Sequence, residues 1–168
     1  MADIDTALAG SREAVAQLIA AGERNGPVWS VARAPGKWSP SQIVEHVALS
    51  LEESANVAAG RPSKFPRLPA LVHPLVRALL FKRVLKKGGF PKARTNKAMD
   101  PARGPATPAE ARVRLEAAHR KFDDACRELA TRGDRIRSTL FGAVPVEEYV
   151  RFIELHTRHH ERQMPDRH

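Results

Sequence analysis

The sequence predicts an all-α protein, a four-helix bundle whose two middle helices are joined by a long connection. Four long stretches repeat apolar residues at spacings of three and four, the period of an amphipathic helix. Two of these stretches begin with a capping signal followed by proline, as helices often do. Only 5% of the 168 residues are aromatic, fewer than a β-sandwich or barrel usually contains. No stretch reads as a convincing strand.

The first two helices have recognisable ends. The first runs from about Asp3 or Asp5 to Arg24, where glycines follow. The second opens with Ser39-Pro40-Ser41-Gln42, in which the serine is an N-cap and the glutamine completes a capping box. We expect this second helix to continue to about Ala59.

The other two helices are equally well marked. The third opens with Thr107-Pro108-Ala109-Glu110 and stops at Gly133. Its apolar residues alternate spacings of four and three, as in a bundle seam: Ala111, Leu115, Ala118, Phe122, Ala125 and Leu129. The fourth starts near Pro145, carries two glutamates in its first turn, and continues to about Met164.

Residues 61–106, between the second and third helices, form a basic, proline-rich crossover insert. The segment from Arg61 to Arg103 holds 12 lysines and arginines against one acid, a net +11, and six of the 13 prolines. The whole chain carries +9, so the rest of it is slightly acidic. Within the insert, Leu75 to Lys86 predicts a short amphipathic helix, and we expect an irregular connection from Gly88 to Pro105.

Composition and length indicate one globular domain spanning residues 1–168. The single cysteine, Cys126, excludes an intrachain disulfide framework and a cysteine-cluster zinc site. No apolar run approaches the roughly 20 residues that a membrane span needs, and we see no secretory signal. We therefore expect a soluble, cytoplasmic protein.

Two histidines of the fourth helix are candidate metal ligands. His156 and His160 are four residues apart and fall in the same arc of the helix as Ile153, whereas His159 falls about 120° away. Imidazoles at this spacing can close on one metal ion. The pattern also arises on solvated helix faces, so it needs a third ligand to be specific.

His46 is the candidate third ligand, because it lies near the edge of the second helix's apolar face and an antiparallel bundle could bring it to the other two. We expect His73, in the insert, and His168, in the tail, to be solvated. His119 lies on the third helix but off its seam, which indicates a surface residue.

Two motifs resemble those of the DinB-like superfamily. The run from Trp38 to Val47 resembles the family's W-S-x-x-x-[IL]-x-x-H-[LV] opening of helix two, and the run from His156 to Gln163 resembles its H-x-x-H-H-x-x-Q. The lead-in from Phe141 to Tyr149 resembles the F-G-x-x-x-x-E-E-[WY] of one branch. The family often has glycine before the final glutamine, where this chain has Arg162.

The resemblance implies an up-down-down-up four-helix bundle and a three-histidine metal site at His46, His156 and His160. Characterised members of the superfamily include thiol-dependent transferases that use bacillithiol, mycothiol or glutathione, and a mycothiol-dependent maleylpyruvate isomerase. Many other members have no known activity. The resemblance therefore implies metal binding more strongly than any particular reaction.

Three neutral imidazoles leave a divalent ion an open position, which is the arrangement of catalytic metal sites. Our first hypothesis is a metal-dependent S-transferase that joins a small-molecule thiol to a small electrophile, and hydrolysis could use the same site. The second is a non-catalytic metal- or ligand-binding bundle. Imidazole ligands suit zinc or nickel best among these alternatives, with cobalt and iron also open.

No catalytic acid or base can be assigned from the sequence. Glu45 and Glu53 on the second helix are more typical of solvated charges than of a general base. Gln163 or Glu161 could orient a ligand imidazole. Among the remaining chemically interesting side chains, the pattern favours core positions: Trp38, Tyr149 and Cys126.

The insert raises a third hypothesis, docking on nucleic acid or on an anionic membrane surface. Its phenylalanines are too scattered for base stacking, so nucleic acid is the weaker partner. The stretch from Leu75 to Lys87 suits lipid better, although we favour an insert that packs on the bundle and solvates its charges. We also expect a homodimer.

Overall fold

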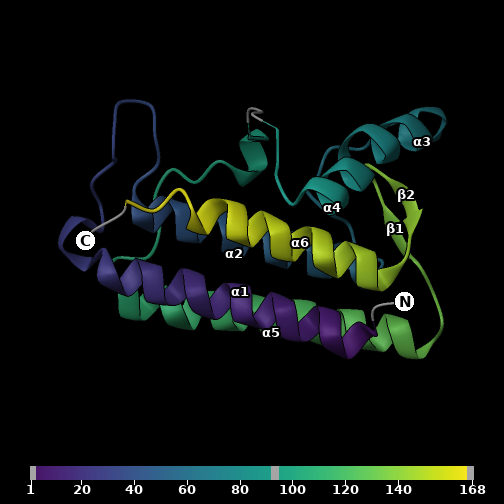
Figure 1. Cartoon of the computed structure of the whole chain (residues 1–168), viewed down its shortest axis with the longest axis horizontal. Coiled ribbons are helices and arrows are strands. Elements are labelled where there is room, and N and C mark those ends of the chain that lie inside the picture. The colour runs from purple at the N-terminus through teal and green to yellow at the C-terminus, as the bar shows by residue number, and fades with distance from the viewer. Residues whose placement is uncertain (1–2, 92–94, 166–168) are drawn as a thin grey trace.

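The computed structural model describes residues 3–91 and 95–165, and the described chain is mostly helical. Four long helices lie side by side (Figure 1), with shorter elements between α2 and α5 and between α5 and α6. The long helices are α1 (Ile4–Arg24), α2 (Pro40–Ala58), α5 (Pro108–Thr131) and α6 (Val146–Glu161). Their ends agree closely with the capping signals, since Ser39 makes a full capping box and the Thr107 hydroxyl accepts from the Glu110 amide.

Polar contacts link α2 to α5 and α1 to α6. Arg114 of α5 pairs with both Glu45 and Glu52 of α2, so these two helices lie along each other. In the same way, the Arg158 guanidinium of α6 donates to Gln17 of α1 at 2.5 Å. α2 packs mainly on α5, and α6 packs mainly on α1.

The apolar faces of all four helices meet in one core. The predicted seam of α5 is confirmed at five of its six positions, which are buried, whereas Ala125 is only partly buried. The buried five are Ala111, Leu115, Ala118, Phe122 and Leu129. They pack with the apolar faces of the other helices, which include Leu8, Leu18, Val47, Leu51 and Val150. This packing fixes which residues of each helix point inward.

The prediction that the chain contains no strand is wrong. A two-stranded antiparallel hairpin, β1 (Ile136–Ser138) and β2 (Gly142–Val144), precedes α6. Ile136 and Val144 pair across it and are fully buried. Strands of three residues are too short to display the alternating pattern by which a sequence reveals a strand.

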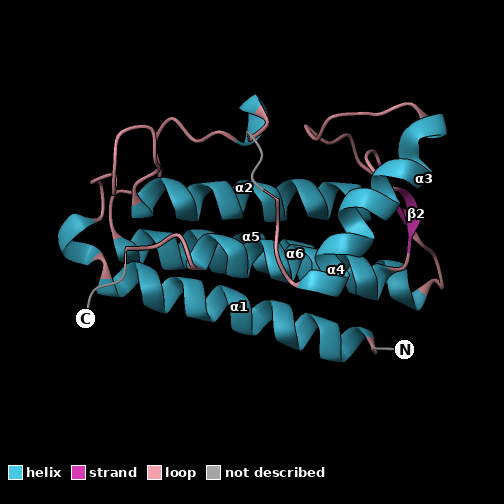
Figure 2. Ribbon diagram, turned by 45° about the horizontal axis from the view of Figure 1, so that its top comes forward, coloured by secondary structure: helices cyan, strands magenta, loops and turns pink. Residues whose placement is uncertain are grey.

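The insert lies along one side of the bundle, with its helical part near the hairpin (Figures 1 and 2). A continuous helical stretch is formed by α3 (His73–Val76), the π-helical turn η3 (Arg77–Lys82) and α4 (Arg83–Lys87). Phe81 of this stretch packs against Phe141 and Phe152, with ring centroids 5.0 and 5.1 Å apart. The helix predicted for Leu75 to Lys86 is therefore present and anchored.

Within residues 3–91 and 95–165 there are also three short 3-10 turns: η1 (Gly26–Val28), η2 (Ala70–Val72) and η4 (Lys97–Met99). The turn η4 interrupts the connection that we expected to be irregular from Gly88 to Pro105. No helix among the described residues is both long enough and apolar enough to cross a membrane.

Candidate metal centre

His46 enters the centre of the molecule from α2, where its side chain is almost entirely buried. Its Nδ1–H donates to the carbonyl oxygen of Met99, 2.7 Å away. A carbonyl can only accept, so this contact places the proton of the neutral ring on Nδ1 and leaves a lone pair on Nε2. The turn η4, capped by the Asn96 side chain, holds that carbonyl in place.

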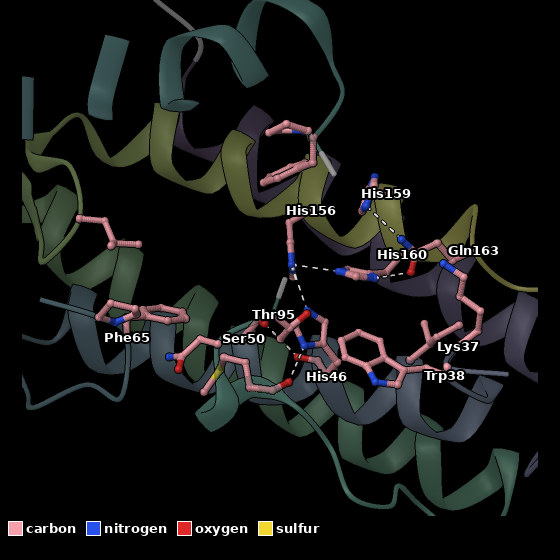
Figure 3. A pocket seen from close by; sticks show the side chains of 18 of the residues that line it. Lys37, Trp38, His46, Ser50, Phe65, Thr95, His156, His159, His160 and Gln163 are labelled. Atoms are coloured by element: carbon pink, nitrogen blue, oxygen red, sulfur yellow. Dashed lines mark hydrogen bonds between the residues drawn. The ribbon is translucent and has the colours of Figure 1, made fainter. Parts of the chain in front are cut away.

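His156 and His160 reach the same point from α6. The Nε2 atom of His156 lies 3.2 Å from Nε2 of His46 and 3.2 Å from Nε2 of His160. Figure 3 shows the three rings converging, and their ligating nitrogens all lie within 4.8 Å of one another. The structure therefore brings together three histidines that are up to 114 positions apart in the sequence.

Gln163 orients the third ring. Its Oε1 accepts from Nδ1–H of His160 at 2.9 Å, and its amide Nε2 donates to His159 Nε2 at 3.0 Å (Figure 3). The Nε2 lone pair of His160 is therefore directed at the cluster, as it is in His46. His159 itself lies outside the cluster, although its ring packs edge-on against that of His160, with the centroids 5.1 Å apart.

Burial keeps the cluster uncharged. It lowers the pKa of His46, His156 and His160, because an imidazolium ion loses its hydration there. The neighbouring rings lower the pKa of His160 further, to about 3. The Nε2 lone pairs of His46 and His160 converge on Nε2 of His156, an arrangement that a cation held between the rings would stabilise.

The donor set fits a divalent transition metal. Zinc binds imidazole nitrogen at about 2.0–2.1 Å, which separates two tetrahedral ligands by roughly 3.4 Å. Two of the separations in the cluster are 3.2 Å. Neutral imidazoles whose far nitrogens are hydrogen-bonded are the usual form of histidine ligands, so the residues present suit such an ion.

A cavity of about 820 Å³ opens onto the cluster. Its walls include the aromatic rings of Trp38, Phe65 and Phe90, and its charged residues are Arg33 and Lys37. No aspartate or glutamate lines it among the described residues. The cavity thus combines aromatic walls with polar groups, and the charged side chains among its described lining residues are cationic.

A family model described as the DinB superfamily matches residues 7–164, nearly the whole chain. The chain belongs to the DinB superfamily. Searches of curated proteins and of solved structures found no match. Membership agrees with the two motifs, one at the start of α2 and one at the end of α6, and these motifs contain all three histidines of the cluster.

Trp38 has a different place in this DinB-superfamily member from the core position that we predicted. The indole is only half-buried and lines the cavity. Its ring centroid lies 4.7 Å from that of His46 and 5.9 Å from that of His160, and its Nε1–H donates to Asp100. The indole therefore forms one side of the candidate centre. Trp38 can reach this place because it directly precedes the N-cap of α2.

Glu45 and Glu53, the two glutamates of α2 considered above as a general base, do not line the cavity. Glu45 pairs with Arg114 at 3.1 Å. The prediction that Glu53 is a solvated charge is wrong, since the residue is 7% exposed and its carboxylate accepts from the backbone N–H of Lys64 at 2.7 Å. Glu53 anchors the start of the insert, an arrangement that depends on a segment outside α2.

Two predictions about other histidines are also wrong. His119 is buried because α1 covers that face of α5, and its Nε2 lies 3.2 Å from the Ser11 hydroxyl. His73 is half-buried rather than solvated, with Nε2 close to the carbonyls of Leu68 and Thr139. His168 lies outside the described residues.

The core assignments of Tyr149 and Cys126 are confirmed. Tyr149 is buried, with its hydroxyl 3.4 Å from that of Ser54. Burial raises the pKa of the Cys126 thiol, so this thiol is not a nucleophile near neutral pH.

The sequence did not reveal three parts of the centre. These are the Met99 carbonyl, the positive side chains of Arg33 and Lys37, and the cavity walls that Phe65 and Phe90 of the insert supply. A backbone carbonyl has no side-chain signature. The Asn96 cap of η4 was the one local signal near it. The other parts depend on how the insert and the loop before α2 fold over the bundle.

Proposed function

We propose that this DinB-superfamily member is a metal-dependent enzyme that joins a small-molecule thiol to a small electrophile. His46, His156 and His160 would hold a divalent ion, with zinc or nickel the best candidates for three imidazole nitrogens. The observation that carries the proposal is the convergence of three Nε2 atoms at the wall of a cavity. We also propose that the four long helices follow the up-down-down-up order of the superfamily.

The chemistry that the ion would supply is Lewis-acid activation, which lowers the pKa of a thiol or water at its open position so that a nucleophile exists near neutral pH. The chain's own residues do the rest. The Met99 carbonyl and Gln163 hold the rings of His46 and His160 in one tautomer. This leaves little freedom for the ligands to reorganise during a reaction.

The cavity supports a charged thiol as one reactant. Low-molecular-weight thiols commonly carry carboxylates, and the positive charges of Arg33 and Lys37 would attract such groups. The rings of Phe65 and Phe90 would exclude water from an apolar electrophile. In the transfer, the thiol proton passes to solvent, since no carboxylate lines the described walls. The sulfur then forms a bond to the electrophilic carbon while the bond from that carbon to its leaving group breaks, and the leaving group departs to solvent as an anion with the bonding electron pair.

The same lack of a carboxylate supports a second candidate, a bundle that binds a metal or a ligand without catalysis. Hydrolysis at this site would ordinarily use a general base, and the described lining residues offer none with a carboxylate. Non-catalytic binding is therefore a stronger alternative to thiol transfer than hydrolysis is.

Elemental analysis of untagged protein, followed by a turnover assay with low-molecular-weight thiols and an alkylating electrophile, tests the proposal. We expect about one equivalent of metal per chain, lost in His46→Ala and in His160→Ala. His159→Ala is the matched control and should retain the metal, because that ring lies outside the cluster. Equal metal content in all three variants would exclude the site, and bound metal without turnover would favour the second candidate.

A further inference from the structure

The turn η2 and the helical stretch α3–η3–α4 that follows it in the insert present an exposed ridge of leucines to solvent. Leu71, Leu75 and Leu79 are 91, 60 and 64% exposed, and they follow one another at intervals of four residues. Only two other large apolar side chains among the described residues are comparably exposed, Val31 and Val113, and each stands apart from this ridge in the sequence. Single exposed leucines are ordinary, whereas a contiguous group marks an interaction site.

The same helical face continues into a basic half. Pro74 and Ala78 fill the spaces between the leucines, and the exposed positions that follow at spacings of three and four are Lys82, Arg83, Lys86 and Lys87. Lys82 pairs with Glu148 at 2.7 Å. Arg83, Lys86 and Lys87 have no ion pair with any described residue. One face is thus apolar at its start and cationic at its end.

The ridge cannot turn inward, because the opposite face of the helix is already used. Phe81 and Val84 are fully buried in the core, and the Arg77 side chain donates to the Ala143 carbonyl of β2 at 3.1 Å. In Figures 1 and 2, α3 lies at one end of the molecule, outside the four long helices. The leucines are therefore held outward by the packing of their own helix.

We infer that this face docks on the surface of an anionic lipid bilayer. Leucines enter the boundary between headgroups and acyl chains, while lysines and arginines contact lipid phosphates. Charge complementarity selects this partner, since the segment from Arg61 to Arg103 carries a net +11 with Asp100 as its single acid. A nucleic acid would use the cations but would leave the leucines in water. The inference does not depend on the proposed reaction.

Co-sedimentation of the full chain with vesicles tests the inference, using phosphatidylcholine alone and phosphatidylcholine mixed with phosphatidylglycerol. We expect binding to the mixed vesicles only, weakened by added salt. Replacing Arg83, Lys86 and Lys87 with glutamine should lower the partition coefficient about a hundredfold, at roughly fivefold per charge. The combined variant Leu71→Ser, Leu75→Ser and Leu79→Ser should lower it at least tenfold.

Matched controls remove other surface groups of the same kind. Val31→Ser with Val113→Ser, and Arg24→Gln with Arg120→Gln and Arg135→Gln, should leave vesicle binding within about twofold. Circular dichroism melts verify that every variant folds.

Four results would overturn the inference. The first is equal binding to neutral and anionic vesicles, and the second is no binding to either. The third is sedimentation equilibrium showing a dimer that the leucine variant dissociates, which would assign the ridge to a second copy of the chain. Binding to a duplex oligonucleotide that the leucine variant retains, without vesicle binding, would assign the basic half to nucleic acid instead.

Discussion

At the scale of single residues, the side chain of Gln163 sets the orientation of two rings. Its carbonyl oxygen accepts from His160 and its amide donates to His159. Because the oxygen fixes the His160 proton on Nδ1, the opposite nitrogen is free to bind a cation. The sequence identified Gln163 as one of two candidates for this role, and the geometry selects it over Glu161.

We predict that Gln163→Leu lowers metal affinity about 10- to 100-fold, the usual effect of losing a partner that orients a ligand. Gln163→Glu is the matched control, because a carboxylate oxygen can still accept from His160. It should bind metal nearly as tightly as the original chain. Competition titration against a chromophoric chelator measures both, and equal affinities for the two variants would contradict the role.

His119 makes a separate polar contact, between α1 and α5. It faces Ser11 and Arg12 of α1 and Asp123 of its own helix. Burial lowers the pKa of His119 below its ordinary value of 6.5. The unfolded chain therefore binds more protons than the folded chain below about pH 6.5, and folding loses stability as the pH falls through that range.

We predict that His119→Gln makes the protein less sensitive to acid. A glutamine amide can keep a hydrogen bond to the Ser11 hydroxyl but does not titrate in this range. The measurement is the free energy of unfolding in urea of the metal-free original chain and of metal-free His119→Gln, from pH 8 to pH 5. The difference between the two free energies isolates His119, since both chains contain the other histidines. A difference that stays constant with pH would contradict the prediction.

At the scale of elements, the crossover is attached to the start of α2. The Pro105 carbonyl accepts from the Ser41 hydroxyl and from the Trp29 indole, both at 2.8 Å. Gly104 beside it has no room for a side chain, since a Cβ there would lie 2.1 Å from the Ser41 carbonyl oxygen. This close approach sets the path of the chain from η4 to α5, and η4 carries the carbonyl that orients His46.

We predict that Gly104→Ala destabilises the protein by about 1–3 kcal/mol, the usual cost of overpacking, and weakens metal binding as η4 shifts. Gly89→Ala is the control, because its added methyl group would meet nothing within 4 Å. Urea denaturation measures both variants. Equal stability of Gly104→Ala and the original chain would contradict the prediction, because it would show that the chain at Gly104 can move away from Ser41 with no loss in the free energy of unfolding.

At the scale of the whole molecule, the histidine cluster joins two helix pairs. α2 packs mainly on α5 and α6 mainly on α1, with less direct packing between α2 and α6. His46 comes from one pair, and the other two histidines come from the second. An ion held by all three would bind the folded chain and not the unfolded one, since the unfolded chain does not hold these residues together.

We predict that the proposed metal stabilises the fold by about 2.7 kcal/mol when its free concentration is a hundred times the Kd. Thermal melts with added zinc or nickel, and after treatment with EDTA, measure the shift. His46→Ala should abolish it, because the ion would lose the one cluster ligand that α2 supplies. A shift of the same size in His46→Ala would place the ion elsewhere.

The four long helices and their caps can be predicted from the sequence, and the motifs that resemble the DinB-like superfamily imply the three histidines of the cluster. These depend on short-range patterns, since helix period and capping act within about four residues. Tertiary structure alone decided the Met99 contact, the place of Trp38, the burial of His119 and the outward leucine ridge. Each of these depends on which distant segment covers a given face, and packing between elements far apart in the chain leaves no local pattern for the sequence to display.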